Sequence, residues 1–515
     1  MFVHEFLERN VSERPHKTAL IFGDQKLSYQ ELDEMAAQFA AALVRKGIGK
    51  GDRVVIVTPN SVEAIIAIFG ILKTGGVFLV VHHSIKEKKL SYILHDCEAR
   101  GIVLFHNQLP AFAPVLESCD SLRCMVLCGG GVGELPLGYV PALSWEDIRN
   151  NEPPLTQSPA MAEQDLACLV YTSGSTGEPK GVMESHACID FATGSIIRYL
   201  ENTAEDIVLN CLPLSFDYGL YQPLMVFKFG GTLVLERSFT FPAAILKKME
   251  KERVTGFPGV PTIFSLLLQM DLSAYDLSSL RYITNTAAAL PVSHIERLCA
   301  KFPQASLYSM YGQTECKRVL YLPPHELKKR PGSVGIAIPG TEVWIQDPEG
   351  KRLLPGSIGQ LVVRGRHVMK GYLNKPKETA CTFGPGRFSE EGVLYTGDIF
   401  RQDEDGFFYF ISRADDIIKT RGEKVAPKEI ENVLYLLPCI LEAAVVGVPD
   451  ELEGEAIKAY LVSSDPDLSA KDVINHCKKH LESFMIPQFI EFRDSLPKSS
   501  AGKIAKRDLM KEPVN

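Results

Sequence analysis

The sequence predicts an α/β fold: a large N-terminal domain of several subdomains, with mostly parallel sheets and a β-rich part, followed by a small α+β C-terminal domain. Three observations support this prediction. Helix-like and strand-like patterns alternate over residues 1–160, short strands and turns take over from about Gly332, and a third pattern begins near Arg413. A chain of 515 residues is also too long for one ordinary core.

The alternation begins with apolar side chains at helical spacing over residues 28–47. A buried strand is predicted over 52–59, a helix over Val62–Lys73 and a strand over 77–81. Strand, helix and strand in this order favour right-handed crossovers and a mostly parallel sheet. Similar apolar runs recur at 123–130, 206–213 and 231–238.

The later patterns differ. Residues 341–353 predict a hairpin around Asp347–Gly350, and 359–368 continue the β pattern. Two further strands are predicted within 442–464, and Ser469 with Asp472 predicts a capped start for the helix Lys471–Leu481. The predicted domains are 1–412, with the β-rich subdomain at about 332–412, and 413–515.

Composition excludes several classes of protein. Hydrophobic residues make up 45% and charged residues 23%, as in soluble globular proteins. The net charge is −8, and no basic face is evident in the sequence, so no nucleic-acid partner is expected. The N-terminus lacks the apolar region of a signal peptide, and Ala64–Leu72 is too short to span a membrane. Twelve scattered cysteines without a CxxC pair favour reduced thiols in the cytoplasm over a zinc site.

The segment YTSGSTGEPKG, residues 171–181, follows the apolar run Leu166–Val170. Its glycines let backbone N–H groups approach phosphate oxygens, its hydroxyls add donors, and Lys180 adds a positive charge. It is not a Walker A loop, because the G-K-[ST] ending is absent. The segment alone leaves open a phosphate-binding loop or an exposed linker.

Four further motifs carry groups suited to a nucleotide. YGQTE, residues 311–315, offers a ring for a base, a hydroxyl for a phosphate and a carboxylate for Mg²⁺. YTGD, residues 395–398, ends in a carboxylate suited to a ribose diol. Residues 412–431 combine an arginine, paired aspartates and a glycine turn, and residues 497–504 place Lys503 on a glycine-containing turn.

In this order and spacing, the five motifs resemble the adenylate-forming superfamily of acyl-CoA synthetases, peptide-synthetase adenylation domains and firefly-type luciferases. The resemblance runs from about residue 10 to residue 507. It implies a large N-terminal domain and a mobile C-terminal domain that enclose the active site. It also implies that ATP activates a carboxylic acid as an acyl-adenylate, with release of pyrophosphate, before a pantetheine thiol takes the acyl group.

The resemblance implies roles for individual residues. Lys503 would bridge the acid and the α-phosphate, where a cation stabilises the meeting of two anions. Glu315 would coordinate Mg²⁺, which neutralises the leaving pyrophosphate, and Thr176 completes the predicted catalytic set. The residues from 172 to 180 would bind the outer phosphates, Tyr311 adenine, Thr314 the α-phosphate, and Asp398 with Arg413 the ribose. The whole predicted ATP-binding set is Thr172, Ser173, Gly174, Ser175, Thr176, Gly177, Lys180, Tyr311, Gly312, Thr314, Asp398 and Arg413.

The second half-reaction would require the C-terminal domain to rotate about a hinge at Asp415. That rotation would withdraw Lys503 and present the loop around Gly422 to the thiol. Coenzyme A and the phosphopantetheine of a carrier protein carry the same arm, so the sequence does not separate these two acceptors. Two departures from the family pattern are Ser412, where glycine is usual, and NTAAALP (285–291), where a glycine-rich stretch is usual.

Residues 212–224 resemble the segment along the acyl pocket. Asp217 matches the aspartate that binds the substrate ammonium in amino-acid-activating members, or else it caps the helix that follows. Three functions remain open: an acyl-CoA-forming ligase, a free-standing enzyme that loads an amino acid onto a separate carrier protein, and a luciferase-like oxidase. The predicted pocket comprises Phe216, Asp217, Tyr218, Gly219, Phe257, Gly259, Asn285 and Met310.

Overall fold

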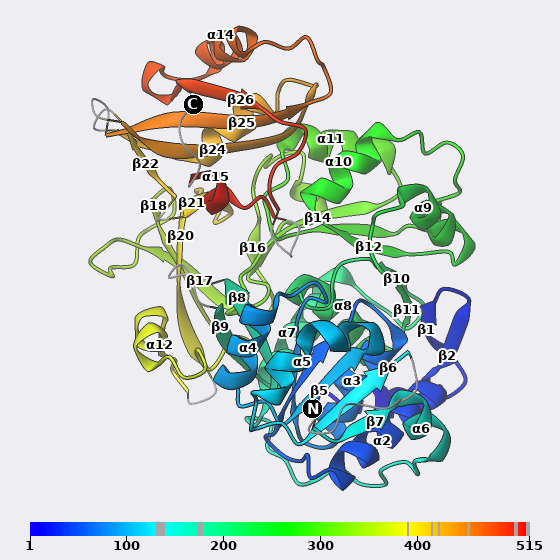
Figure 1. The fold of residues 1–515 in the computed structure, drawn as a ribbon. Coiled ribbons are helices and arrows are strands. Elements are labelled where there is room, and N and C mark those ends of the chain that lie inside the picture. Colours follow the sequence, from blue (N-terminus) through cyan, green and yellow to red (C-terminus); the bar gives the residue numbers. More distant parts are fainter. Residues whose placement is uncertain are drawn as a thin grey trace.

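The computed structural model describes residues 1–129, 140–173, 179–388, 391–413, 416–420, 423–450, 454–498 and 503–510. These residues form four sheets (Figure 1). Two large sheets make up the N-terminal body, and two five-stranded sheets follow them in the chain. The predicted α/β class and the β-rich subdomain are confirmed, but two strands of that subdomain are long, with 8 and 11 residues.

The seven-stranded sheet has the order β7-β6-β5-β3-β4-β8-β9. Its neighbours pair in parallel, except that β8 and β9 are antiparallel. Between β3 and β4, and between β5 and β6, a helix joins the parallel neighbours, as predicted. The strands are β3 (Arg53–Val57), β4 (Val77–Val80), β5 (Gly101–Phe105), β6 (Cys124–Cys128), β7 (Ala142–Ser144), β8 (Leu166–Ser173) and β9 (Pro179–Ser185). The helices are α2 (Tyr29–Arg45), α3 (Val62–Lys73), α4 (Glu87–Asp96), η1 (His106–Gln108), α5 (Leu109–Glu117) and α6 (Trp145–Asn151).

The nine-stranded sheet has the order β16-β15-β14-β13-β12-β10-β11-β1-β2. It is parallel from β14 to β1, and both of its edges are antiparallel. The strands are β1 (Thr18–Phe22), β2 (Gln25–Ser28), β10 (Ile207–Asn210), β11 (Thr232–Leu235), β12 (Gly256–Gly259), β13 (Tyr282–Asn285), β14 (Ser306–Tyr311), β15 (Leu320–Tyr321) and β16 (Ile336–Ala337). The helices are α1 (Glu5–Glu13), α7 (His186–Leu200), α8 (Asp217–Phe229), α9 (Pro242–Lys251), α10 (Pro261–Gln269), α11 (Val292–Lys301) and η2 (Pro324–Glu326).

The carboxyl ends of three neighbouring strands in this sheet carry predicted site residues. Gly259 on β12 is in register with Asn285 on β13, and Asn285 is in register with Ser309 on β14, just before Met310 and Tyr311. In open parallel sheets, ligands bind beyond the carboxyl ends of the strands. The topology therefore brings residues from three separate motifs to one edge.

The β-rich region is an antiparallel sheet of β17 to β21. The predicted hairpin around Asp347–Gly350 is only partly present. The Gly350 N–H closes the turn on the Asp347 carbonyl, but the chain returns through a single bridge between Gln346 and Arg352, and the partner of β17 is β18. The elements are β17 (Glu342–Gln346), β18 (Ile358–Gly365), α12 (Pro376–Thr382), β19 (Phe383–Pro385), β20 (Gly392–Gln402) and β21 (Phe408–Arg413).

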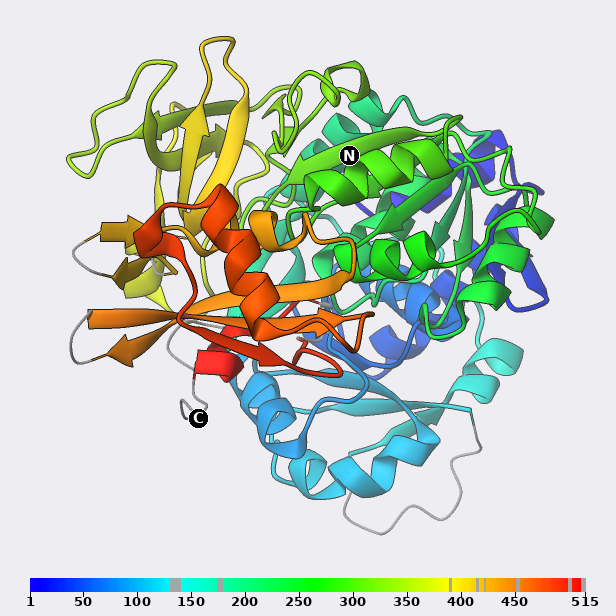
Figure 2. The same cartoon turned by 90° about the horizontal axis from the view of Figure 1, so that it is seen from above.

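The C-terminal sheet, orange to red in Figures 1 and 2, has its own apolar core. Ser469 and Asp472 form the predicted capping box, and the helix begins at Ala470. Ser293 on α11 donates a hydrogen bond to the Tyr435 carbonyl at 3.1 Å, which joins this region to the N-terminal body. The elements are β22 (Ile418–Thr420), β23 (Glu423–Val425), α13 (Pro427–Leu434), β24 (Ile440–Asp450), β25 (Gly454–Ser463), α14 (Ala470–His480), η3 (Ser483–Met485), β26 (Phe489–Phe492) and α15 (Lys506–Met510).

No helix in the described parts of the chain has the length and apolar character that crossing a membrane requires. All twelve cysteines lie in described ranges as free thiols, and most are buried. A cytoplasmic location stays a prediction.

Gly312 begins the turn that joins β14 to β15, and we predict that Gly312→Ala destabilises the protein. A Cβ atom there would clash with the Lys317 carbonyl oxygen. Such overpacking typically costs about 1–3 kcal/mol. Urea unfolding measures the loss against Gly49→Ala, because a Cβ at Gly49 would meet nothing within 4 Å. Equal unfolding midpoints for the two variants would contradict this account of the turn.

Candidate active site

The predicted phosphate loop joins two paired strands. Thr172 on β8 is in register with Lys180 on β9, so the strand ends bring these two residues opposite each other. The loop residues Gly174, Ser175, Thr176 and Gly177 lie outside the described residues, and only the backbone of Ser173 is described. The Lys180 ammonium lies 5.1 Å from the centroid of the Tyr372 ring, within cation–π range.

Tyr372 also contacts Glu315. Its hydroxyl donates a hydrogen bond of 2.7 Å to Glu315 Oε1. Burial, together with the charge of Glu315, raises the pKa of Tyr372, so the phenol stays a neutral donor. Lys180 and Glu315 belong to motifs far apart in the sequence, yet both contact Tyr372. Tyr372 belongs to none of the sequence motifs, and no local signal marks it.

Asp398 is buried among polar partners at the junction of β20 and β21. Its Oδ2 accepts hydrogen bonds from the Tyr311 hydroxyl at 2.6 Å and from Gln313 Nε2 at 2.8 Å. Arg413, its cross-strand partner, places Nε 3.3 Å from Oδ1. Burial raises the pKa of the Asp398 carboxyl, while Arg413, Tyr311 and Gln313 favour its charged form. Within the described residues, Oδ1 accepts no hydrogen bond.

Lys503 reaches the same place from the C-terminal region. Its ammonium lies 5.8 Å from the centroid of the Phe216 ring. The residue as a whole is exposed, yet the protein around the ammonium lowers its pKa by desolvation, and Arg413 lowers it further. The charges of three acids oppose this shift: Asp217, Asp398 and Glu315. Five predicted residues are thus close enough to interact electrostatically.

Asp217 is the first residue of α8 and is buried. Its Oδ1 accepts a hydrogen bond from the Tyr218 N–H at 2.9 Å, as a residue at a helix start can. Its charge also raises the pKa values of Lys503 and Lys317. The capping alternative is wrong, because Phe216 is the N-cap residue of α8 and no side chain caps that helix. The charge of Asp217 does act on ammonium groups, but these belong to the chain itself.

The other predicted pocket residues have different surroundings. The Tyr218 ring packs edge-on to Phe216 at 6.4 Å, and its hydroxyl donates to the Thr284 carbonyl at 2.8 Å. Met310 Sδ accepts a hydrogen bond from the Tyr199 hydroxyl at 2.9 Å. Packing contacts dominate the surroundings of two residues. Phe257 packs between Phe239 and Phe264 in the core, and Gly219 is needed for close packing of its helix on the Leu212 and Pro213 carbonyls.

Two further predicted residues complete the wall. Asn285 donates to the Ala288 carbonyl at 3.1 Å through Nδ2, and its buried Oδ1 has no hydrogen-bond partner among the described residues. A Cβ on Gly259 would run into the Phe264 ring. Thr314 is half-buried between Gln313 and Glu315. The predicted hinge Asp415 and thiol-tunnel residue Gly422 lie outside the described residues.

Sequence reasoning missed a buried ion pair whose lysine interacts electrostatically with Asp217. Lys317 and Glu184 are 1% and 0% exposed and form a salt bridge, and the Tyr221 hydroxyl donates to Glu184 Oε2 at 2.9 Å. Although burial lowers the pKa of Lys317, Glu184 and Asp217 raise it above its ordinary value, so the ammonium is charged. Lys317 lies two residues after YGQTE, and this closeness to a motif was the one sequence feature that could have pointed to the pair.

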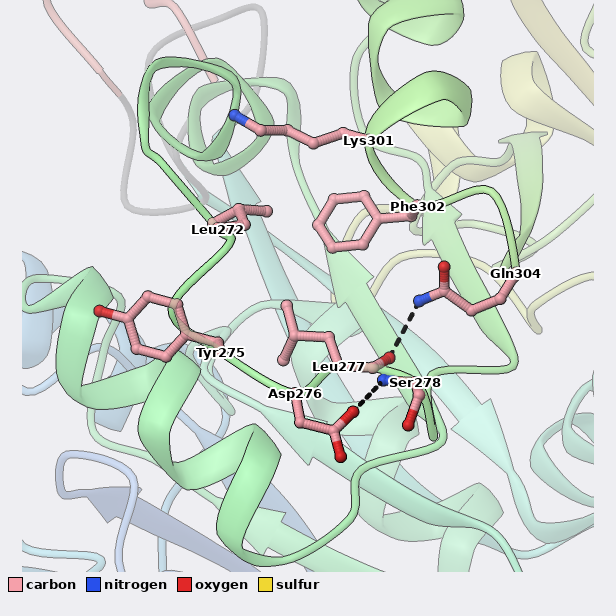
Figure 3. Close-up of a pocket in the computed structure, with 8 residues that line it drawn as sticks. All are labelled: Leu272, Tyr275, Asp276, Leu277, Ser278, Lys301, Phe302 and Gln304. Atoms are coloured by element: carbon pink, nitrogen blue, oxygen red, sulfur yellow. Dashed lines mark hydrogen bonds between the residues drawn. The ribbon is translucent and has the colours of Figure 1, made fainter.

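A separate hollow of about 350 Å³ shares no residue with this site (Figure 3). Its polar groups bind one another or the backbone: Gln304 donates to the Leu277 carbonyl, and the Ser278 N–H donates to Asp276. The Lys301 ammonium binds the carbonyl groups at the end of α10. The hollow is lined by Leu272, Tyr275, Asp276, Leu277, Ser278, Lys301, Phe302 and Gln304.

We predict that Lys317→Met destabilises the fold by about 3–5 kcal/mol, because it leaves the Glu184 carboxylate buried without its cation. The double variant Lys317→Met/Glu184→Gln is expected to recover much of that loss, since it removes both charges. Urea unfolding of the two single variants and the double variant measures the coupling. Arg253→Met breaks the exposed pair with Asp276 and serves as a control expected to cost under about 1 kcal/mol. A similar loss of unfolding free energy in Arg253→Met and in Lys317→Met would contradict the claim that burial makes the Lys317–Glu184 pair more costly to break.

Comparison with known proteins agrees with this geometry. The model of the AMP-binding enzyme family matches residues 7–373, and that of the AMP-binding enzyme C-terminal domain matches residues 429–503. A long-chain-fatty-acid–CoA ligase of Bacillus subtilis (strain 168) is 31% identical over 535 residues, which cover 99% of this chain and 94% of the relative.

Solved structures extend the similarity to the whole fold. The anthranilate CoA ligase AuaEII in complex with anthranoyl-AMP has a TM-score of 0.91 and 28% identity, covering 99% of this chain and 96% of that one. O-succinylbenzoate coenzyme A synthetase from Bacillus subtilis in complex with ATP and magnesium ion has a TM-score of 0.84 and 26% identity, covering 98% and 99%. The chain belongs to the AMP-binding enzyme family and is an adenylate-forming enzyme, an AMP-forming acid–thiol ligase, as its motifs predict.

Proposed function

We propose that this chain activates a carboxylic acid lacking an α-amino group with ATP and then transfers the acyl group to coenzyme A. The observation that carries the proposal is that the charges of Asp217, Glu315, Asp398 and Arg413 all act on the Lys503 ammonium, which lies over the Phe216 ring. The Lys503 ammonium would therefore lie between the substrate carboxylate and the α-phosphate of ATP, the two anions that must react. Electrostatic stabilisation of that encounter is the largest catalytic contribution a protein can make to it.

The residues around Asp398 fit the ribose of ATP. Its buried Oδ1, which accepts no hydrogen bond within the described residues, suits a hydroxyl donor, and the Arg413 guanidinium lies beside it. Glu315 fits a divalent cation: its partner Tyr372 is neutral, and no Lys or Arg pairs with it in the described part of the chain. Bound Mg²⁺ would neutralise charge on the pyrophosphate that leaves.

In the first half-reaction, a carboxylate oxygen of the acid attacks the α-phosphorus of ATP, and the bond to pyrophosphate breaks. Lys503 would contact both the carboxylate and the α-phosphate and so reduce their repulsion as they approach. Thr172, near the end of β8, and Lys180, near the start of β9, would border the outer phosphates. Tyr311, fixed through Asp398, would lie along the adenine.

In the second half-reaction, the thiol sulfur attacks the acyl carbon and AMP leaves. The relatives named above are CoA ligases, which supports coenzyme A over the phosphopantetheine of a carrier protein. Lys503 lies against Phe216, so it must withdraw to admit the thiol. We propose rotation of the domain 413–515 against 1–412 about Asp415, with the loop at Gly422 facing the thiol.

The surroundings of Asp217 support an acid without an amine. Its charge already acts on Lys317 and Lys503, whose pKa values it raises. A substrate ammonium would therefore add a third cation rather than satisfy a lone anion. This argues against the alternative of an amino-acid-loading enzyme.

We predict that Lys503→Met lowers the rate of ATP–pyrophosphate exchange by about 10²- to 10³-fold, because it removes a preorganised charge. Exchange is measured without thiol, so that only adenylation is observed. Lys478→Met, an exposed lysine on α14, is the matched control and should keep the full rate. An unchanged rate for Lys503→Met would remove Lys503 from the mechanism.

A second prediction concerns pH. Lys503 acts as a cation below its pKa, and the Asp217 charge raises that pKa against desolvation. With an acid that lacks an amine, exchange should fall at alkaline pH, and Asp217→Asn should move this fall to lower pH. Selective loss of exchange with α-amino acids, at an unchanged pH profile, would instead identify Asp217 as an ammonium partner.

A further inference from the structure

Arg318 is a buried arginine without an anionic partner. The residue is 4% exposed, and its enclosed Nε has no hydrogen-bond partner. In the described part of the chain, neither terminal nitrogen forms a hydrogen bond or an ion pair. Unlike Nε, the terminal nitrogens are not fully enclosed, so they stay open to an acceptor. A guanidinium does not lose its proton in a protein, so its burial is costly until an acceptor arrives.

The neighbours of Arg318 are residues of the predicted acid pocket. Its Cζ lies 4.5 Å from the centroid of the Tyr218 ring. Tyr218 packs against Phe216, and the Lys503 ammonium lies over the Phe216 ring. The Arg318 charge also reaches the Tyr199 hydroxyl, which binds Met310. Arg318 and Lys503 therefore border the same group of aromatic side chains, linked through Phe216 and Tyr218.

The adjacent lysine shows that the surplus charge belongs to Arg318. Lys317 forms its salt bridge with Glu184, which Tyr221 also binds. Asp217 acts on Lys503 and Lys317. Lys317 thus pairs with a carboxylate, and acidic charges act on Lys503, whereas the recorded contact of Arg318 is with the face of the Tyr218 ring. A cation–π contact compensates part of the burial cost, but it satisfies none of the N–H donors.

We propose that Arg318 binds a second carboxylate of the substrate, so that the acid this enzyme activates is a dicarboxylic acid. This inference rests on the proposed function and names its substrate class. One carboxylate reacts beside Lys503, and the other stays ionised in a charge-assisted, bidentate pair with the guanidinium. An acid with an apolar end would leave the guanidinium buried and unpaired, which disfavours its binding.

The test compares each dicarboxylic acid with its own monomethyl ester, in a series of aliphatic and aromatic acids of increasing length. The full-length enzyme is assayed by ATP–pyrophosphate exchange. We expect kcat/KM to be at least about 10²-fold higher for the best diacid than for its ester, since a buried polar site rejects a ligand that leaves it unpaired. Arg318→Met should lower kcat/KM for the diacid to the level of the ester, mainly through KM. Arg318→Lys should keep part of the preference.

Arg237→Met provides the matched control, because this exposed arginine also lies over an aromatic ring, Phe22. It should retain the wild-type preference. The shift in thermal unfolding midpoint on adding diacid or ester gives a readout independent of turnover. If Arg318→Met fails to fold, the wild-type ratio and Arg318→Lys still decide.

Equal use of diacid and ester by the wild type, or an equal loss for both in Arg318→Met, would overturn the inference. Exchange with monocarboxylic acids alone would overturn it while leaving the proposed function intact. Exchange with no acid of any class would overturn both.

Discussion

The network around Asp398 is the constraint on which the rest of the site depends. A buried carboxylate is stable only with donors and a cation, and here Tyr311, Gln313 and Arg413 supply them. Tyr311 ends a strand of the nine-stranded sheet, whereas Asp398 and Arg413 belong to the β-rich sheet. The same contacts that would orient a nucleotide thus connect the two sheets.

Charge balance extends this constraint into the acid pocket. Lys503, Lys317 and Arg318 come from two distant segments. Glu184 pairs with Lys317, and the charges of Asp217, Asp398 and Glu315 act on Lys503. Burial makes each unmatched charge costly, so such a cluster is stable when its charges alternate. Arg318 breaks the alternation, and the missing anion is the part of the site that a ligand completes.

Local features of the fold were predictable from the sequence, and long-range ones were not. The helix Val62–Lys73 and the box at Ser469 follow from periodicity and capping chemistry, which act within a few residues. The turn at Asp347–Gly350 was predictable, but the pairing of β17 with β18 was not, because turn residues specify a reversal and not which strand pairs. In the same way, Tyr372 and Glu184 carry no local motif, and their roles arise from contacts across more than thirty residues of chain.

This difference explains why the reaction class was easier to predict than the acid. The groups suited to ATP lie within short motifs, and each keeps its chemistry wherever the chain carries it. The acid pocket instead combines the start of α8, the end of β9 and the return from YGQTE, and the character of each residue depends on the others. Lys317 and Arg318 are adjacent cations in the sequence, yet only the fold distinguishes them, because Glu184 neutralises the first and leaves the second for a substrate.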